Sequence, residues 1–223
     1  QGQEETVLGL LSSAREQFPG SLPLYELSIE MLEWQLQQGR SKKLPATMLN
    51  RLEQRLNEER VLCAEILVQN TQQRRAVEIL EQVAAADEDN ITCRQRLAEV
   101  LEESQAEKAA GWWRQLGEIH SRRGLLDRAQ EAFEKALQLS PKAADVRQRL
   151  AEISSRRGSV EEATAQQRQL ARQAMEENKP QAAAEALEKI LLQLPEDRES
   201  LEWLAEHYDS ADEKEKASAK AEV

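Results

Sequence analysis

The residues that could support catalysis or bind a metal are few in this sequence. It has two histidines, His120 and His207, and two cysteines, Cys63 and Cys93. The cysteines are not spaced as in a structural zinc site, and two histidines cannot complete a set of four ligands. We also find no glycine-rich phosphate loop and no ordered Ser-His-Asp set. The sequence therefore predicts no metal, no cofactor and no enzymatic activity.

The remaining role for these groups is packing. His120 follows Trp113 and Leu116 at a spacing of three to four residues, so the three face one side of a helix. We predict that His120 is buried and that His207, between acidic neighbours, is on the surface. Cys63 takes a position that suits a core leucine, which predicts a buried thiol. A Cys63–Cys93 disulfide remains an alternative.

A helical hairpin over residues 110–142 must position His120. Its first helix ends at Gly124, after the cations Arg122 and Arg123, as expected of a helix C-terminus. The second helix starts near Asp127, whose carboxylate suits the positive end of the helix dipole. Because two helices cannot cover their own apolar faces, the hairpin must stack on further copies.

This hairpin resembles the tetratricopeptide repeat in the order and spacing of its residues. The matching residues are Trp113, Leu116, Gly117, Ala129, Phe133, Ala136 and Pro141. Only position 120 departs, since His120 stands where tyrosine is usual. The resemblance implies an all-α fold, a right-handed α-solenoid of helical hairpins. It also implies a concave groove that binds a protein or peptide.

A longer repeat, three helices in length and with a period of about 53–54 residues, runs through the chain. The run 94–99 recurs identically at 147–152 and is echoed at 204–206, while 114–116 returns at 168–170. The pattern Ala132-x-Glu134-Lys135 likewise returns as Ala186-x-Glu188-Lys189. Two packings satisfy this period: helices that alternate between two layers, which we favour, or a third layer formed by the last helix of each set.

The predicted organisation is a single α-solenoid over 1–223. Its parts are divergent helices at 1–56, set 1 at 57–109, set 2 at 110–163 with the clearest unit at 110–143, set 3 at 164–208, and a tail at 209–223. The predicted helices are 6–17, 22–38, 46–70, 73–86, 91–104, 107–123, 126–139, 144–157, 160–178, 180–194 and 198–208. A break of the third helix near Asn57 is the alternative. We expect the tail to be the frayed start of a further helix or a solvated tail. Trp34 and Trp203 are predicted to be core residues.

Composition narrows the function classes. The 223 residues are 40% hydrophobic, 4% aromatic and 32% charged, which fits many exposed helices with small residues at their contacts. A net charge of −11 disfavours nucleic acid as a partner because phosphate repels an acidic surface. No apolar run approaches the roughly 20 residues needed for direct membrane insertion. The start at Gln1, without Met or a signal sequence, is read as a fragment of a longer soluble protein. The use of only two cysteines favours the cytoplasm over the periplasm.

The resemblance also implies where a partner binds. Carried onto this chain, the groove positions of the first helices give the candidate partner-binding residues Arg114, Glu118, Arg168, Arg172, Glu65, Gln95, Gln148 and Trp112. Arg114, Arg168 and Arg172 are read as a cationic ladder for an acidic peptide, since arginine binds carboxylates in a bidentate manner. The alternative, which we favour, is that they pair with Glu118 and neighbouring acids on a solvated face.

These observations predict a non-catalytic scaffold that binds a protein or peptide in a solenoid groove. The alternative is a structural spacer or regulatory module within a larger multidomain protein. Self-association through the exposed ends of the repeat array is a further option, because an uncovered repeat end exposes apolar surface.

Overall fold

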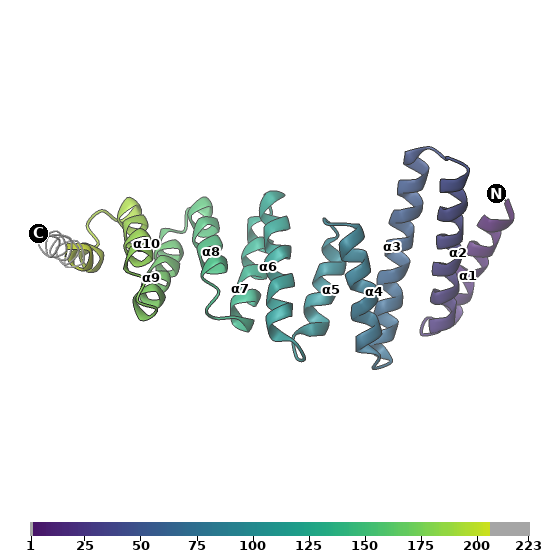
Figure 1. Ribbon diagram of the computed structural model, residues 1–223, viewed down its shortest axis with the longest axis horizontal. Helices are drawn as coiled ribbons and strands as arrows, with labels where there is room; N and C mark the ends of the chain where they lie inside the picture. Colours follow the sequence, from purple (N-terminus) through teal and green to yellow (C-terminus); the bar gives the residue numbers. More distant parts are fainter. Residues whose placement is uncertain (1, 206–223) are drawn as a thin grey trace, which may run out of the picture. The chain divides into compact units, whose positions relative to one another are not determined.

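The computed structural model describes the backbone of residues 2–205 and the side chains of residues 6–205. Within this range all regular structure is helical (Figure 1), so the predicted all-α class is confirmed. The predictions for His207 and for the tail 209–223 lie outside the described residues.

Ten helices span most of the described range, and residues 198–205 are helical as well. The helices are α1 (Gly2–Gln17), α2 (Leu22–Ser41), α3 (Ala46–Gln69), α4 (Gln73–Ala86), α5 (Ile91–Leu101), α6 (Ala106–Arg122), α7 (Leu126–Leu139), α8 (Ala144–Arg157), α9 (Val160–Glu176) and α10 (Pro180–Gln193). The long α3 runs without a break, so the alternative of a break near Asn57 is wrong.

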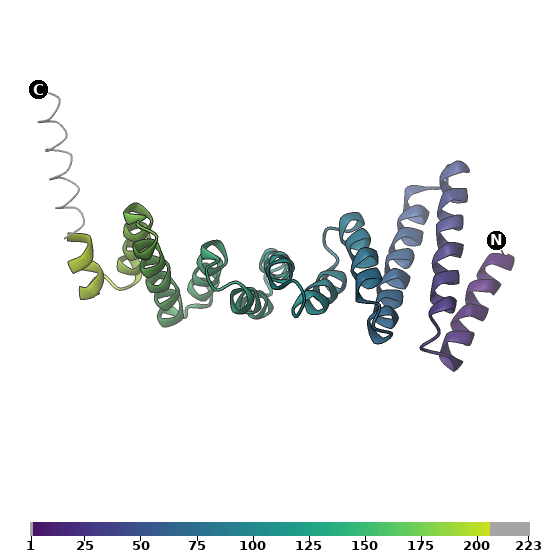
Figure 2. The same cartoon turned by 60° about the horizontal axis from the view of Figure 1, so that its bottom comes forward.

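The chain divides into two compact units, residues 1–112 and 113–223, and α6 spans their junction. In both units, consecutive helices run antiparallel and are joined by short turns (Figures 1 and 2). Gly124 and Gly158 end α6 and α8 with φ of 73° and 80°, a conformation that glycine adopts without strain.

In the first unit, helices two apart in the sequence also contact each other. Arg15 of α1 pairs with Glu59 of α3, and Arg75 of α4 donates to Glu26 of α2 at 2.8 Å. Leu32 of α2 is fully buried in a cluster that joins α1, α2 and α3.

In the second unit, the core is centred on the hairpin of α6 and α7. Phe133 is fully buried and its ring lies directly against the backbone of Gly117. Polar contacts then join α6 to α8, and Gln193 of α10 donates to Ser155 of α8 at 2.6 Å. Gln173 of α9 donates to the carbonyl of Lys142, in the turn between α7 and α8, at 2.8 Å. These contacts place the helices of this unit in two rows. One row holds α6, α8 and α10, and the other holds α7, α9 and residues 198–205.

Helix bounds follow the spacing of the sequence repeat. α6 begins at residue 106 and α9 at 160, while α7 begins at 126 and α10 at 180, so both starting points shift by the same period. The members of each pair have the same length, 17 residues for α6 and α9 and 14 for α7 and α10. Residues one period apart therefore occupy corresponding places on the two hairpins.

The two tryptophans predicted to lie in the core differ in their burial. Trp34 is 44% exposed, so that prediction is wrong. Its neighbours Leu32 and Leu36 face the core and take the helix positions on either side. Trp203 is partly buried and packs against the apolar cluster of the second unit.

The two cysteines lie inside the first unit. Cys63 and Cys93 are both buried and free. This confirms the predicted buried thiol at Cys63 and rules out the disulfide.

Candidate partner-binding surface

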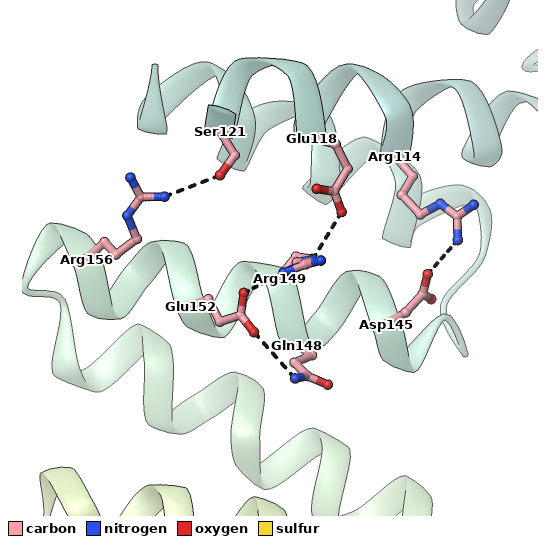
Figure 3. A network of polar contacts seen from close by, with 8 residues as sticks. All are labelled: Arg114, Glu118, Ser121, Asp145, Gln148, Arg149, Glu152 and Arg156. Atoms are coloured by element: carbon pink, nitrogen blue, oxygen red, sulfur yellow. Dashed lines mark hydrogen bonds and ion pairs between the residues drawn. The ribbon is translucent and has the colours of Figure 1, made fainter. Parts of the chain in front are cut away.

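A row of polar contacts joins α6 to α8 on the solvent-exposed side of the second unit (Figure 3). Arg114 donates to Asp145 at 2.6 Å, near the start of α8. One turn further along α6, Glu118 accepts from Arg149 at 3.0 Å. Ser121 accepts from Arg156 at 3.4 Å near the other end. Because Arg114, Glu118 and Ser121 are three to four residues apart, they lie on one face of α6.

Arg114, Glu118 and Arg149 each have an opposite charge beside them. Arg149 also donates to Glu152 at 2.9 Å, and Gln148 donates to the other oxygen of Glu152 at 3.4 Å. The hydrogen bond with Glu152 is the main reason why the pKa of Arg149 is raised above its usual value. Burial alone would raise the pKa of Asp145, but the hydrogen bond from Arg114 and the local backbone hold it below the usual value. The surface is therefore one of mixed and balanced charge.

The first unit contains the same arrangement one period earlier in the sequence. Arg96 donates to Glu65 of α3 at 2.8 Å and to Glu99 at 2.9 Å, and Gln95 donates to Glu99 at 2.9 Å. These residues correspond one by one to Arg149, Glu118, Glu152 and Gln148. Four of the predicted site residues, Glu65, Gln95, Glu118 and Gln148, thus belong to a duplicated polar cluster.

The predicted residues of α9 lie elsewhere. Arg168 pairs with Asp197, beyond α10, and approaches Glu199 at 3.7 Å. Hydrogen bonds from Ser200 and, less strongly, from Arg168 hold the pKa of Asp197 below its usual value. Arg172 is 61% exposed, and its ion pair with Glu199 is long, at 4.0 Å.

The structure does not bring Arg114, Arg168 and Arg172 together as a ladder. Arg114 binds Asp145 between α6 and α8, whereas the two α9 arginines contact residues 197–199. The reason is that α6 and α9 face different neighbours: Arg114 on α6 faces α8, whereas the α9 arginines face the segment that follows α10. Arg114 and Arg168 pair instead with neighbouring acids, as the alternative reading expected, although the acids are Asp145 and Asp197 rather than Glu118.

Asp145, Arg149 and Asp197 were not predicted from the sequence. A signal for one of them was present: Arg96 and Arg149 both lie in the identical run, each 31 residues after a glutamate. The last predicted residue, Trp112, is half-buried.

His120 and the cysteines have the character of core groups. His120 is buried, and burial followed by the nearby Arg128 and Arg123 lowers the pKa of its imidazole. Burial raises the pKa of the Cys63 thiol to about 11 and that of Cys93 to about 12. Neutral thiols of this kind are poor nucleophiles at physiological pH. Over the described residues, no group of three or more metal-binding side chains is found, and no helix is long and apolar enough to cross a membrane.

Several solved structures match this chain at low sequence identity. The structure of MamA is 14% identical, with a TM-score of 0.37, and the match covers 69% of this chain and 96% of that one. A putative kinesin light chain with nearly identical TPR-like repeats from Podosopora anserina is 16% identical, with a TM-score of 0.41, over 96% and 97% of the two chains. MamA from Desulfovibrio magneticus RS-1 is 17% identical, with a TM-score of 0.31, over 87% and 97%. No curated protein matches the chain.

The family comparison is more specific than these structural likenesses. Residues 110–153 match the description "Tetratricopeptide repeat". This region contains α6, α7 and most of α8, and so includes the surface between α6 and α8. Repeats of this family are in general protein–protein interaction scaffolds without catalytic activity. The resemblance seen in the sequence is therefore confirmed for residues 110–153, which match the tetratricopeptide repeat.

Proposed function

We propose that this chain is a non-catalytic scaffold that binds a protein or peptide partner along the α6–α8 surface. The observation that carries the proposal is the polar row of Arg114, Glu118 and Arg149 with their partners. These side chains are partly exposed and are held in place by one another, so they are ordered before a partner arrives. Preorganised side chains lose little conformational entropy on binding.

The balance of charge on this surface supports a partner of mixed charge. A purely acidic peptide would have to displace Asp145 from Arg114 and Glu118 from Arg149. An acidic partner is better served by Arg172, which is exposed and weakly paired. We therefore propose that an acidic peptide, if it is the partner, binds at Arg172 of α9 rather than at a ladder that includes Arg114.

The test compares the two surfaces by charge reversal. We would use the chain as it is to capture partners from an extract, identify them by mass spectrometry, and titrate the purified partner against three proteins. These are the wild type, Arg114→Glu/Arg149→Glu on the α6–α8 surface, and Arg168→Glu/Arg172→Glu as the matched control on α9. The proposal expects that only the first double variant weakens binding by tenfold or more.

Loss of binding in the α9 variant alone would move the site to Arg172 and support an acidic partner. Equal binding by all three proteins would refute both surfaces. Circular dichroism checks that helix content is the same in all three. The Arg114 and Arg149 pairs are exposed, and such pairs contribute only about 0–1 kcal/mol to stability. The Arg168–Asp197 pair is partly buried, so the melting temperature of the α9 variant is measured as well.

A second candidate function is a spacer or regulatory module inside a longer protein. The balanced charges favour it as well, because a surface whose charges are satisfied internally needs no partner. Self-association through a repeat end would instead use apolar groups near the end of the described range, such as Leu192, which is 83% exposed. Sedimentation analysis at several concentrations separates these options, since a spacer stays monomeric and a self-associating end does not.

A further inference from the structure

A hollow of about 320 Å³ lies between α8, α9 and α10 in the second unit. In Figure 2 these three helices form the group next to residues 198–205. Small side chains on α9 and α10, including Ala174, Ala182 and Ala186, form much of its wall, with Leu170 beside them. Gln167 and Lys189 also line it. An apolar cavity of about 150 Å³ is already large enough to bind benzene, so this hollow has room for an aromatic group.

The sequence repeat explains why there is space. In the hairpin of α6 and α7, the core is filled by the rings of Trp113, His120 and Phe133, all buried. At the corresponding positions one period later, the hairpin of α9 and α10 has Gln167, Ala174 and Leu187. All three rings are replaced by smaller groups. Two of these positions, Gln167 and Ala174, line the hollow, in a hairpin with the same helix lengths as the first.

The lysine above the missing ring is still present. In the first hairpin, Lys135 lies over the ring of Trp113, with its Nζ 4.1 Å from the ring centre. Its counterpart one period later is Lys189, which lines the hollow. None of the described residues that line the hollow with Lys189 is aromatic. An ammonium group attracts an aromatic face, so this edge of the hollow favours an aromatic guest.

Gln167 lines the hollow and has a hydrogen-bond acceptor without a partner among the described residues. Its side chain is 7% exposed, and its Oε1 is buried with no hydrogen-bond partner among the described residues. A buried acceptor without a donor is unfavourable, and a guest that brings an N–H or O–H group would relieve this. A carboxylate or phosphate brings only acceptors, and the lining has three carboxylates, Asp145, Glu177 and Glu185, against two lysines, Lys179 and Lys189.

We propose that the hollow binds an aromatic side chain with a hydrogen-bond donor, tryptophan or tyrosine, from a partner protein. The ring would lie on the alanine-lined wall beneath Lys189, and its N–H or O–H would donate to Oε1 of Gln167. The partner thus supplies the ring that the chain itself has at Trp113. This inference rests on the proposed scaffold function, and it gives that function an anchoring side chain of defined chemistry.

The test uses indole and benzofuran as probes, because both have the same fused-ring shape but only indole carries an N–H donor. Binding is followed by ligand-observed NMR, which detects millimolar affinities. Four proteins are compared with the wild type: Gln167→Trp, which fills the hollow as Trp113 does, Gln167→Leu, which removes the acceptor, Lys189→Met, and Lys135→Met as the matched control in the filled hairpin.

The wild type is expected to bind indole roughly 2- to 10-fold more tightly than benzofuran, the effect of one net hydrogen bond. Gln167→Leu should remove this preference, and Gln167→Trp should abolish binding of both probes. Lys189→Met should weaken indole about 2- to 5-fold, whereas Lys135→Met should leave it unchanged. A melting temperature of Gln167→Trp at or above that of the wild type shows that the ring has entered the hollow.

Three results would overturn the inference: no binding of indole, equal affinity for the two probes, or unchanged indole binding in Gln167→Trp. Testing whether Gln167→Trp still captures the protein partner distinguishes failure of this inference from failure of the proposed function. If the variant retains the partner while Arg114→Glu/Arg149→Glu loses it, the scaffold function stands and the aromatic anchor fails. If Gln167→Trp loses both indole and the partner, the anchor is supported.

Discussion

The close packing in the second unit between Gly117 and Phe133 gives the sharpest test of the fold. A Cβ atom added at Gly117 would lie 2.7–2.8 Å from three ring carbons of Phe133. Contacts this short are not tolerated, so the ring or the helix must move. The ring is fully buried, and close-packed interiors leave it little room. Gly117→Ala should therefore force a local rearrangement.

Two opposing effects set the size of the change. Overpacking a core typically costs about 1–3 kcal/mol, while alanine is about 1 kcal/mol better than glycine within a helix. The net destabilisation of Gly117→Ala is then roughly 0–2 kcal/mol, so this variant alone does not isolate the contact. Gly111→Ala in the same helix is a matched control, because a Cβ there meets no atom within 4 Å. It should stabilise the protein by about 1 kcal/mol.

A double-mutant cycle with Phe133→Leu isolates the contact. Phe133→Leu alone destabilises the protein because it leaves a cavity. The cost is smaller than that of Phe133→Ala, which would be about 3–5 kcal/mol. In its background, Gly117→Ala no longer meets the ring and keeps its helical benefit. The hairpin of α9 and α10 already contains this pair as Ala171 and Leu187. We expect a favourable coupling energy of about 1–3 kcal/mol.

The assay is equilibrium unfolding in urea of the wild type, the two single variants, the double variant and the Gly111→Ala control. Helix content by circular dichroism follows the transition, and the free energies of unfolding give the coupling. A coupling energy within about 0.5 kcal/mol of zero would mean that residues 117 and 133 are independent. The proposed register of α6 on α7 would then be wrong.

Three further predictions concern titrating groups. Burial and nearby arginines lower the pKa of His120 in the folded state, so the stability of the protein should fall as the pH drops below about 6.5. His120→Phe should show a smaller fall in melting temperature between pH 7 and pH 5.5, and a fall equal to that of the wild type would refute this. Cys63 and Cys93, with pKa values raised to about 11 and 12, should not react with a thiol reagent at pH 8 until urea unfolds the protein, and rapid labelling of the folded protein would contradict their burial. The pKa of Asp197 is lowered in the folded state, so its charged form stabilises the fold at pH values above the ordinary carboxyl pKa of 3.8. Asp197→Asn should therefore lower the melting temperature at pH 7, and the gap between variant and wild type should shrink as the pH falls below 3.8. A gap that stays constant with pH would argue against the charged pair.

The helices themselves could be read from the sequence. The predicted ranges 73–86, 126–139 and 144–157 coincide with α4, α7 and α8. Apolar spacing, glycines after cationic turns and prolines at helix ends are local signals, and helix hydrogen bonds join residues only four apart. The same local pattern identified the tetratricopeptide repeat and the burial of His120 and Cys63.

The site was predicted less well, because its contacts join residues far apart in the sequence. Arg149 meets Glu118 across 31 residues, and Arg168 meets Asp197 across 29. Such pairs depend on which helices lie side by side. The corresponding arginines Arg114 and Arg168 lie on α6 and α9, which face different neighbours. Exposed ion pairs also contribute little energy, so they leave only a weak pattern in the sequence.

The sequence by itself determined that this chain is helical, where its helices lie along the chain, and that one hairpin follows the tetratricopeptide pattern. Only the tertiary structure decided that the α6–α8 surface has balanced charges, that Trp34 is exposed, and that a hollow lies between α8, α9 and α10. The physical reason is the range of the forces involved. Helix formation depends on neighbours along the chain, whereas charge pairing and packing volume depend on which surfaces the fold brings together.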